Sequence, residues 1–375
     1  MRVLYFSRTL TGHDRRFLAK LAESEHEIWF LALEEHSPLP SDLAAKVRTA
    51  PSLGAAGFGI RQLPGLAPRL QASLSKIRPD LVHAGPVPSC GYLAALAGFH
   101  PLLLQSWGSD ILVDADRDAA HQEATRSALA HADALFCDCD AVRVKAQSLG
   151  GPTGDRVVQF PWGVDLQRFR PGAAPQSRQR LGWQDAFVVL STRSWEPLYG
   201  IDVLVEAFRL AARREPRLRL LLAGSGSLAP AVEAQIAAGG LEGFTHRPGN
   251  IDHDQLPDYF RAADLFMSCS YSDGSSVSML EAMATALPVL LTDAPGNREW
   301  VAAGENGWLG APGNAESFAT GLLRAVKASS REREAMGAAN RRAVESRADW
   351  HRNFPKLLEA YSRLGSARTE RTGGA

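Results

Sequence analysis

The chain has 375 residues, of which 45% are hydrophobic and 22% are charged, and its 41 Lys and Arg residues balance 41 Asp and Glu residues. This length suffices for two domains of ordinary size, and the composition is typical of a folded globular protein. The balanced charge argues against a nucleic-acid-binding protein, which needs a basic footprint to displace counterions from phosphate. We find no secretion signal, no apolar window long enough to span a bilayer and too few cysteines for a disulfide scaffold, so we expect a cytoplasmic protein.

Short, continuous apolar runs alternate with amphipathic stretches along the first 165 residues. Such runs are typical of parallel strands that are covered on both faces. We expect strands at Arg2–Ser7, His26–Leu33, Asp80–Ala84, Pro101–Ser106, Ala134–Asp138 and Val157–Trp162, and helices at Arg15–Glu23, Ala119–Ala130 and Ala141–Leu149. Strands and helices in alternation predict a doubly wound parallel sheet.

The alternation stops in the segment 160–172, where Pro and Gly cluster, and then begins again. Further strands are expected at Phe187–Thr192, Leu218–Gly224, Leu265–Ser270 and Pro288–Asp293, with helices at Asp202–Arg214, Ala229–Ala238, Gln255–Ala263 and Ser276–Ala286. We therefore predict an α/β fold of two facing Rossmann-like domains, 1–165 and 166–345, with a ligand cleft between them. Residues 346–375 are expected to form a helix, Trp350–Leu364, that packs back toward the first domain, and then a disordered tail from Ser366.

The loop after the strand at Leu265–Ser270 has the most unusual composition of the chain. It is rich in Gly and Ser, it contains Asp273, and it leads into an Ala-rich helix that carries Glu281. Uncapped amides and the positive end of the helix dipole suit a diphosphate. The alternative is structural: Ser276 caps the helix and Asp273 begins a turn.

This segment resembles the signature of the retaining GT-B glycosyltransferases of family four, the group 1 glycosyl transferases. The family has Glu, seven residues, Glu, and then Ala-Met-Ala-x-Gly-x-Pro-Val. Here Asp273 replaces the first Glu with a side chain one methylene shorter, Glu281 is the second, and Ala286 replaces Gly. The resemblance implies that Glu281 binds the ribose of a nucleotide and that Asp273 reaches the transferred sugar. It also implies donor contacts by the backbone amides of the residues that follow Asp273, namely Gly274, Ser275, Ser276 and Val277.

A second matching segment follows the strand at Phe187–Thr192. The family usually has Arg, five residues and Lys-Gly there, with both cations serving the diphosphate, whereas this chain has Arg193 and then Tyr199-Gly200. Tyr199 can donate a hydrogen bond but cannot neutralise charge. Either Arg193 and the helix dipole suffice, or another cation such as Arg247 or Arg298 substitutes. The turn Gly249-Asn250-Ile251 stands where the resemblance implies contacts to the nucleobase.

The first half resembles the family more loosely. Its first loop is reduced to Thr9–Asp14, in which Gly12, His13 and Asp14 are candidate acceptor ligands, although Asp14 can equally be a helix cap. Asp110, in the segment that follows another strand, is a further acceptor candidate. His83, at the end of a buried strand, is interpreted as a core histidine.

The resemblance implies a retaining, metal-independent transferase of the hexosyltransferase type, which moves a sugar from a nucleotide-diphosphate donor to a glycan, lipid-linked or small-molecule acceptor. We expect no cofactor and no metal; Asp138-Cys-Asp140 has the form of a metal motif, but Asp140 opens a helix. The family resemblance suggests cell-surface polysaccharide or glycoconjugate synthesis. Two other functions stay open: a non-catalytic sugar-nucleotide-binding partner subunit, favoured by Tyr199 and Asp273, and a nucleotide-sugar epimerase.

The segment Arg61–Arg78 carries four basic residues and no acidic ones beside five Leu and Ile residues. This pattern fits either an ordinary surface helix or a helix that lies on the anionic inner face of the cell membrane.

Overall fold

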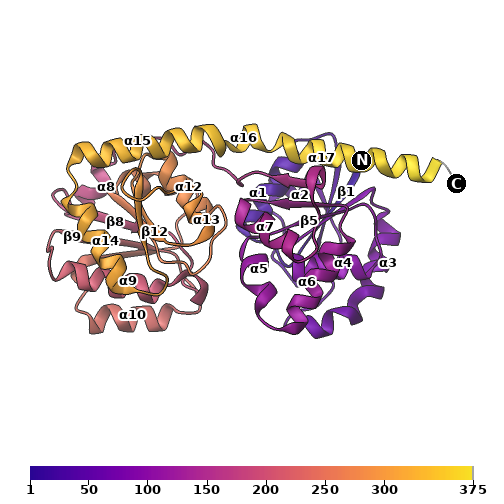
Figure 1. The fold of residues 1–375 in the computed structure, drawn as a ribbon, viewed down its shortest axis with the longest axis horizontal. Coiled ribbons are helices and arrows are strands. Elements are labelled where there is room, and N and C mark those ends of the chain that lie inside the picture. Colours follow the sequence, from indigo (N-terminus) through magenta and orange to yellow (C-terminus); the bar gives the residue numbers. More distant parts are fainter. Residues whose placement is uncertain (374–375) are drawn as a thin grey trace. The chain divides into compact units, whose positions relative to one another are not determined.

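The computed structural model describes the backbone of residues 1–373 and the side chains of residues 1–366 (Figure 1). The chain divides into two compact units: unit 1 comprises Met1–Phe160 together with the segment from Phe354 onward, and unit 2 comprises Pro161–Asn353. Each unit is built on its own parallel sheet.

Unit 1 contains a seven-stranded parallel sheet in the order β3-β2-β1-β4-β5-β6-β7. The strands are β1 (Arg2–Ser7), β2 (Glu27–Ala32), β3 (Val47–Thr49), β4 (Leu81–Ala84), β5 (Leu102–Gln105), β6 (Ala134–Cys137) and β7 (Val157–Gln159). The helices are α1 (Gly12–Leu21), α2 (Ser41–Ala44), α3 (Ala67–Ile77), α4 (Tyr92–Leu96), α5 (Ser109–Leu112), α6 (Ala119–His131), α7 (Asp140–Ser148) and α17 (Pro355–Gly373).

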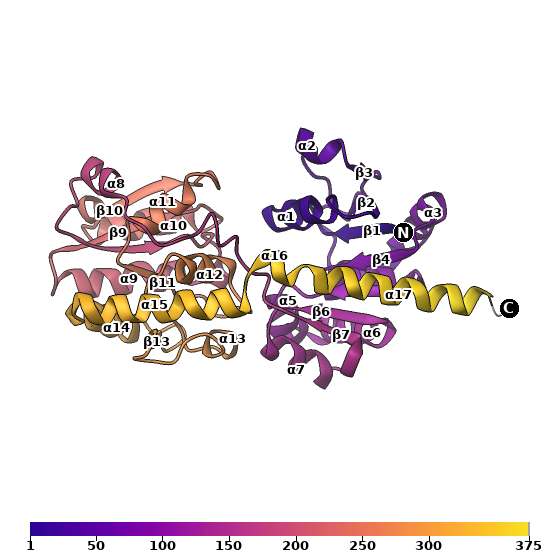
Figure 2. The same cartoon turned by 90° about the horizontal axis from the view of Figure 1, so that it is seen from above.

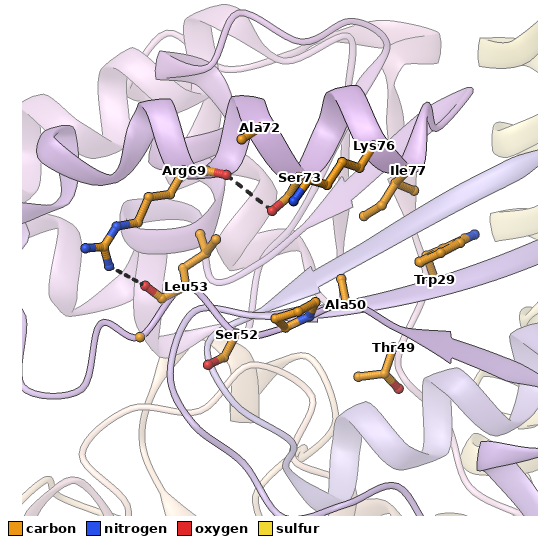
Figure 3. A pocket seen from close by; sticks show the side chains of 12 residues that line it. Trp29, Thr49, Ala50, Ser52, Leu53, Arg69, Ala72, Ser73, Lys76 and Ile77 are labelled. Carbon is orange, nitrogen blue, oxygen red and sulfur yellow. Dashed lines mark hydrogen bonds between the residues drawn. The ribbon is translucent and has the colours of Figure 1, made fainter.

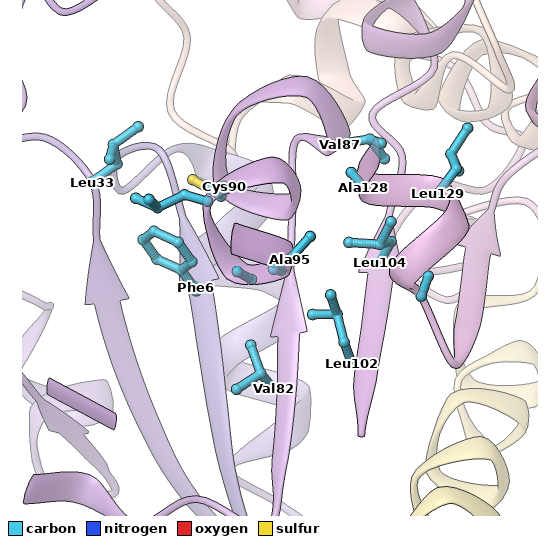
Figure 4. Packing of buried hydrophobic residues seen from close by; sticks show 14 of the residues in the cluster. Phe6, Leu33, Val82, Val87, Cys90, Ala95, Leu102, Leu104, Ala128 and Leu129 are labelled. Carbon is cyan, nitrogen blue, oxygen red and sulfur yellow. The ribbon is translucent and has the colours of Figure 1, made fainter. Parts of the chain in front are cut away.

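Alternate side chains of these strands point to opposite faces of the sheet, so both faces are apolar. On one face, Phe6, Val82 and Leu104 pack against Leu129 of α6 and the residues of α3 and α4 (Figure 4). The other face is covered partly by α17, which contacts β4 and β7 (Figure 2). Tyr361 of α17 is fully buried, and its hydroxyl lies 2.5 Å from Nδ1 of His83. The C-terminal helix is thus part of the core of unit 1.

Unit 2 contains a six-stranded parallel sheet in the order β10-β9-β8-β11-β12-β13. The strands are β8 (Phe187–Ser191), β9 (Leu218–Ala223), β10 (Thr245–Gly249), β11 (Leu265–Ser268), β12 (Val289–Thr292) and β13 (Gly307–Gly310). The helices are α8 (Pro175–Arg180), α9 (Ile201–Ala212), α10 (Ala229–Ala238), α11 (Leu256–Arg261), α12 (Val277–Ala284), α13 (Pro295–Arg298), α14 (Ala315–Lys327), α15 (Ser330–Arg347) and α16 (Trp350–Asn353). One apolar cluster joins the sheet to α9, α10 and α14, and another joins it to α11, α12 and α15.

The strands and helices predicted from the sequence are present, with ends that differ by a few residues, except that the predicted helix Trp350–Leu364 is interrupted at Phe354 and forms α16 and the first part of α17. Three strands were not predicted: β3, β10 and β13, each of which lies at the edge of its sheet. The tail also differs from the prediction, because α17 continues through Gly373 instead of giving way to a disordered segment at Ser366. Residues 374–375 of that expected tail lie outside the described residues.

Candidate functional site

Two loops of unit 2 that are distant in sequence meet at one edge of its sheet. Arg193 follows β8, and Asp273 lies in the loop that joins β11 to α12. Since β8 and β11 are neighbouring parallel strands, their carboxyl ends lie side by side. This edge is where ligands bind in open parallel sheets.

The guanidinium of Arg193 connects these two loops. Its Nη2 donates to Oδ1 of Asp273 over 2.5 Å, and its Nη1 donates to the hydroxyl oxygens of Ser276 over 2.5 Å and of Ser278 over 3.1 Å. The side chains of the ion pair are only 11% and 8% exposed. Hydrogen bonds of this kind, in which one or both partners are charged, are stronger than neutral ones. Arg193 is therefore fixed with its charge beside the start of α12.

Tyr199 packs against the guanidinium instead of supplying a second cation. The Cζ atom of Arg193 lies 4.3 Å from the centre of the Tyr199 ring, a distance at which a cation is attracted to an aromatic face. The next residue, Gly200, has φ +57°, and a Cβ there would lie 2.4 Å from the carbonyl oxygen of Cys269. A glycine at this position thus lets the turn that carries Tyr199 approach the end of β11.

The two other cations considered from the sequence are both paired elsewhere. Arg247 forms an ion pair with Glu233, and the Nε of Arg298 lies 2.6 Å from Oδ1 of Asp293. Neither residue is therefore an unpaired replacement for the usual Lys. Arg193 is the predicted cation that the structure brings to the start of α12.

Asp273 is buried beside that cation. Burial raises the pKa of its carboxyl, and the nearby charge of Arg193 and hydrogen bonds from Ser270 and Arg193 act in the opposite direction. The loop is also packed closely against α13, because a Cβ at Gly296 would lie 2.3 Å from the carbonyl oxygen of Asp273. The position of the carboxylate is thus set by packing as well as by charge.

The N-terminus of α12 does not use Ser276 as a cap. Ser276 occupies the N-cap position, but its side chain makes no capping hydrogen bond and instead accepts a hydrogen bond from Arg193. In the same loop, the hydroxyl oxygen of Ser275 accepts a hydrogen bond from the indole nitrogen of Trp300 over 3.1 Å. The helix start therefore keeps the uncapped geometry that suits an anion.

The remaining predicted donor ligands lie on α12 and at the end of β10. Glu281 is 6% exposed on α12, and its Oε1 is 3.9 Å from Nε2 of His253. Gly249 has φ +73° and its carbonyl oxygen accepts from the amide of Gly224, while Asn250 is exposed and accepts from the hydroxyl of Ser225. Ile251 is half-buried next to them, and Gly274 and Val277 flank the serines of the α12 loop.

Three contacts at this site involve residues that we did not predict: Ser278, Trp300 and His253. Ser278 had a sequence signal, because it belongs to the same serine-rich stretch two residues after Ser276. The contacts of Trp300 with Ser275 and of His253 with Glu281 join residues that are 25 and 28 positions apart in the sequence, so no local sequence pattern predicts them.

In unit 1, the structure gives two predicted acceptor ligands a structural role instead. Asp14 is fully buried, forms a capping box with Thr11 at the start of α1 and accepts a hydrogen bond from the hydroxyl of Tyr5. Asp110 is 2% exposed and accepts hydrogen bonds from the hydroxyl of Ser106 and from three backbone amides. Both carboxylates are occupied by the chain itself, so we correct the prediction that they bind an acceptor.

The other two acceptor candidates remain accessible. Gly12 and His13 are exposed at the start of α1, and the ring of His13 packs edge-on against Trp107 at a centroid distance of 5.8 Å. A pocket of about 250 Å³ also lies at the carboxyl edge of this sheet. Its polar lining includes Arg8, Ser89 and His121. These residues were not predicted, because they come from separate parts of the chain: the loop after β1, the helical turn Val87–Gly91 and α6.

The membrane-surface interpretation of Arg61–Arg78 is not supported. The segment forms a 3-10 turn followed by α3, and its apolar residues belong to the core of unit 1: Leu63, Leu66, Leu70, Leu74 and Ile77. Since that apolar face is buried in the protein, it is not available to enter a lipid surface.

No helix within the described part of the chain is both long and apolar enough to cross a membrane. Among the same residues, no group of three or more His, Cys, Asp and Glu side chains is arranged to hold a metal ion.

Comparisons with known proteins relate both units to glycosyltransferases. Residues 174–343 match the family model "Glycosyl transferases group 1", and residues 2–139 match "Glycosyl transferase 4-like". The D-inositol 3-phosphate glycosyltransferase of Geodermatophilus obscurus is 32% identical over 217 residues, which are 55% of this chain and 47% of that protein. The protein of the same name from Kineococcus radiotolerans is 30% identical over 278 residues, which are 69% of this chain and 64% of that protein. The alignments thus span about half to two thirds of the length of these curated relatives.

Solved structures resemble the chain over almost its whole length. Sucrose-phosphate synthase from Thermosynechococcus elongatus has a TM-score of 0.82 at 20% identity, with 98% of this chain and 100% of that chain covered. Anabaena HepE in complex with UDP-glucose has a TM-score of 0.80 at 20% identity, with 97% and 100% covered. At this identity the likeness shows the fold, which is GT-B. The two family models, which match segments of both units, and the GT-B fold together support a family-four glycosyltransferase.

Proposed function

We propose that this protein is a retaining glycosyltransferase that moves a hexosyl group from a nucleotide-diphosphate sugar to an acceptor hydroxyl. The observation that carries the proposal is the convergence of Arg193, Asp273 and the uncapped start of α12 at one edge of the unit 2 sheet. A cation and a set of helix amides can together bind a diphosphate.

In this proposal, each residue predicted to bind the nucleotide-sugar donor has a separate role. Arg193 and the amides of the α12 loop hold the diphosphate, and Tyr199 keeps the guanidinium in place through its ring. Asp273 contacts the transferred sugar, Glu281 binds the ribose hydroxyls, and the turn that follows Pro248 contacts the base. The buried positions of Asp273 and Glu281 support these roles, because hydrogen bonds to a ligand are strong where water is excluded.

The chemistry that we propose needs charge stabilisation more than a protein base. As the glycosidic bond to the diphosphate breaks, negative charge builds on the leaving phosphate beside Arg193 and the α12 amides. The acceptor hydroxyl attacks from the same face and gives its proton to the leaving phosphate, so the anomeric configuration is retained. Fixed donors that are already oriented stabilise such charge without reorganisation. We propose that the reaction needs no metal; full activity after EDTA treatment would support this, and loss of activity restored by a divalent cation would refute it.

We assign acceptor recognition to unit 1, at its pocket of about 250 Å³ lined by Arg8, Ser89 and His121. The volume suits one sugar or polyol ring, and the lining of basic and hydroxyl groups, together with the ion pair of Asp114 and Arg117, suits a polar or phosphorylated acceptor. Since the relatives named above are D-inositol 3-phosphate glycosyltransferases, that compound is the first acceptor to test. The next acceptors to test are glycans and lipid-linked acceptors, because we propose that the enzyme acts in the cytoplasm in the synthesis of cell-surface glycoconjugates.

The primary experiment measures donor binding and turnover in matched variants. A calorimetric screen of nucleoside diphosphates and their sugars identifies the base, and product NMR determines the anomeric configuration. Arg193→Lys keeps the charge but loses the forked hydrogen bonds, so we expect kcat to fall about 100-fold. Arg214→Ala removes an exposed cation of the same unit and serves as control. Wild-type turnover in Arg193→Lys would contradict the assigned role.

The ion pair between Arg193 and Asp273 also favours a second candidate, a non-catalytic sugar-nucleotide-binding subunit. With Tyr199 in place of a Lys, the pair leaves the start of α12 without net positive side-chain charge. Donor binding without release of nucleotide diphosphate, with every acceptor class tested, would make this the better assignment. Conversion of a nucleotide sugar in the absence of an acceptor would instead indicate an epimerase.

A further inference from the structure

An open groove of about 570 Å³ runs along the β2–β3 edge of unit 1, between α3 and the segment that follows β3 (Figure 3). Its volume lies within the range of pockets that hold small organic ligands. It is separate from the acceptor pocket at the carboxyl edge of the same sheet, with which it shares no lining residue. The proposed function does not use it.

The floor of this groove is apolar. Trp29 of β2 lies at one end, and Ala50, Leu53 and Ile77 contribute aliphatic surface along its length (Figure 3). Ala50, Leu53 and Ile77 also belong to the buried core, so the floor is a rigid surface of packed side chains. An apolar ligand group that lies on it covers the apolar surface that the lining residues, Trp29 included, still expose.

Two cations from the exposed side of α3 border this floor. Arg69 and Lys76 are seven residues apart, which places them on the same side of a helix about 10 Å from each other. The guanidinium of Arg69 donates to the carbonyl oxygen of Leu53 over 3.1 Å. Within the described residues, no carboxylate pairs with either cation, and no acidic residue lines the groove. The groove is therefore both apolar and positively charged.

We propose that this groove binds one alkyl chain of an anionic lipid, with the chain on the Trp29–Leu53 floor and the phosphate headgroup paired with Lys76. The two cations favour a negatively charged headgroup, and the apolar floor favours an alkyl chain. This mode differs from a helix that lies on a membrane, because the leucines of α3 stay in the core and the lipid comes to the polar side of the helix. A site of this kind would hold the enzyme near lipid or retain a lipid-linked substrate.

The test uses the full chain and dodecyl phosphate below its micelle concentration, titrated by isothermal calorimetry. We expect binding at one molecule per chain, no detectable binding of inorganic phosphate, and weaker binding of the uncharged dodecyl maltoside. Lys76→Ala should weaken the affinity for dodecyl phosphate about fivefold, as for the loss of one exposed ion pair. Ala72→Trp adds a ring on the exposed wall of the groove and should abolish binding, while its melting temperature verifies folding.

Arg61→Ala is the matched control, since Arg61 is exposed in the same segment but does not line the groove. Its affinity should equal that of the wild type. An equal loss in Arg61→Ala and Lys76→Ala would indicate diffuse electrostatic attraction and overturn the proposal. Undiminished binding in folded Ala72→Trp would also overturn it, as would binding to anionic phospholipid vesicles without any binding of dodecyl phosphate.

Discussion

Replacement of Asp273 by Asn tests the central ion pair of unit 2. In the free chain, the guanidinium of Arg193 is neutralised by a carboxylate that is 8% exposed. A diphosphate that binds there must share Arg193 with Asp273 and also tolerate the negative charge of Asp273. The Asn side chain keeps an oxygen that accepts the hydrogen bond of Arg193 but removes this charge.

The size of the effect follows from the repulsion between the carboxylate of Asp273 and a diphosphate bound beside Arg193. Two unit charges about 4 Å apart interact by about 4 kcal/mol at an effective dielectric constant of 20. Desolvation offsets much of this energy. We therefore expect the affinity for the nucleoside diphosphate to rise by about 1.4 kcal/mol, or about tenfold. Turnover of the nucleotide sugar should fall, because the variant lacks the carboxylate that contacts the transferred sugar.

Calorimetry with the nucleoside diphosphate and a steady-state assay with the nucleotide sugar measure the two effects separately. Asp258→Asn is the control: its carboxylate forms an ion pair with Arg261 in the same unit but is 63% exposed, so its loss should change neither quantity by more than about twofold. A fall in diphosphate affinity in Asp273→Asn would refute the charge argument. Unchanged turnover would show that Asp273 only positions Arg193.

Three further predictions concern other residues. Glu281→Gln should weaken nucleoside diphosphate binding about tenfold, because it removes a buried carboxylate that we assign to the ribose; an equal affinity by calorimetry would remove that assignment. In Gly296→Ala the new Cβ would clash with the carbonyl oxygen of Asp273, so the free energy of unfolding should fall by about 1–3 kcal/mol and the affinity for the donor should fall as well. Gly243→Ala is the control: its new Cβ has open space, so neither quantity should change. Burial lowers the pKa of His83 to about 3, so this residue stays neutral in the folded state while the unfolded chain protonates near pH 6.5. Urea unfolding should therefore show stability lost as pH falls from 6.5 toward 3, by up to about 1.4 kcal/mol per pH unit, and His83→Gln should flatten this slope; parallel curves would contradict it.

The sequence by itself determined the two-sheet architecture, because each buried parallel strand is a continuous apolar run that can be recognised from the local sequence. The three missed strands have a common cause. β3 is only three residues long, β10 reads Thr-His-Arg-Pro-Gly and β13 reads Gly-Trp-Leu-Gly, and each has one neighbour only. An edge strand needs less apolar surface, so its pattern resembles that of a loop.

Candidate site residues could be named from the sequence, but their neighbours were decided by the tertiary structure. Arg193 and Asp273 were selected by motif, yet their hydrogen bond across 80 residues exists only because β8 and β11 are adjacent in the sheet. The reverse holds for Asp14 and Asp110, which have the residue type of an acceptor ligand but are buried and accept hydrogen bonds from other segments of unit 1. A short motif specifies which chemical groups a loop carries. Only packing between distant segments determines whether those groups face one another, the core or solvent.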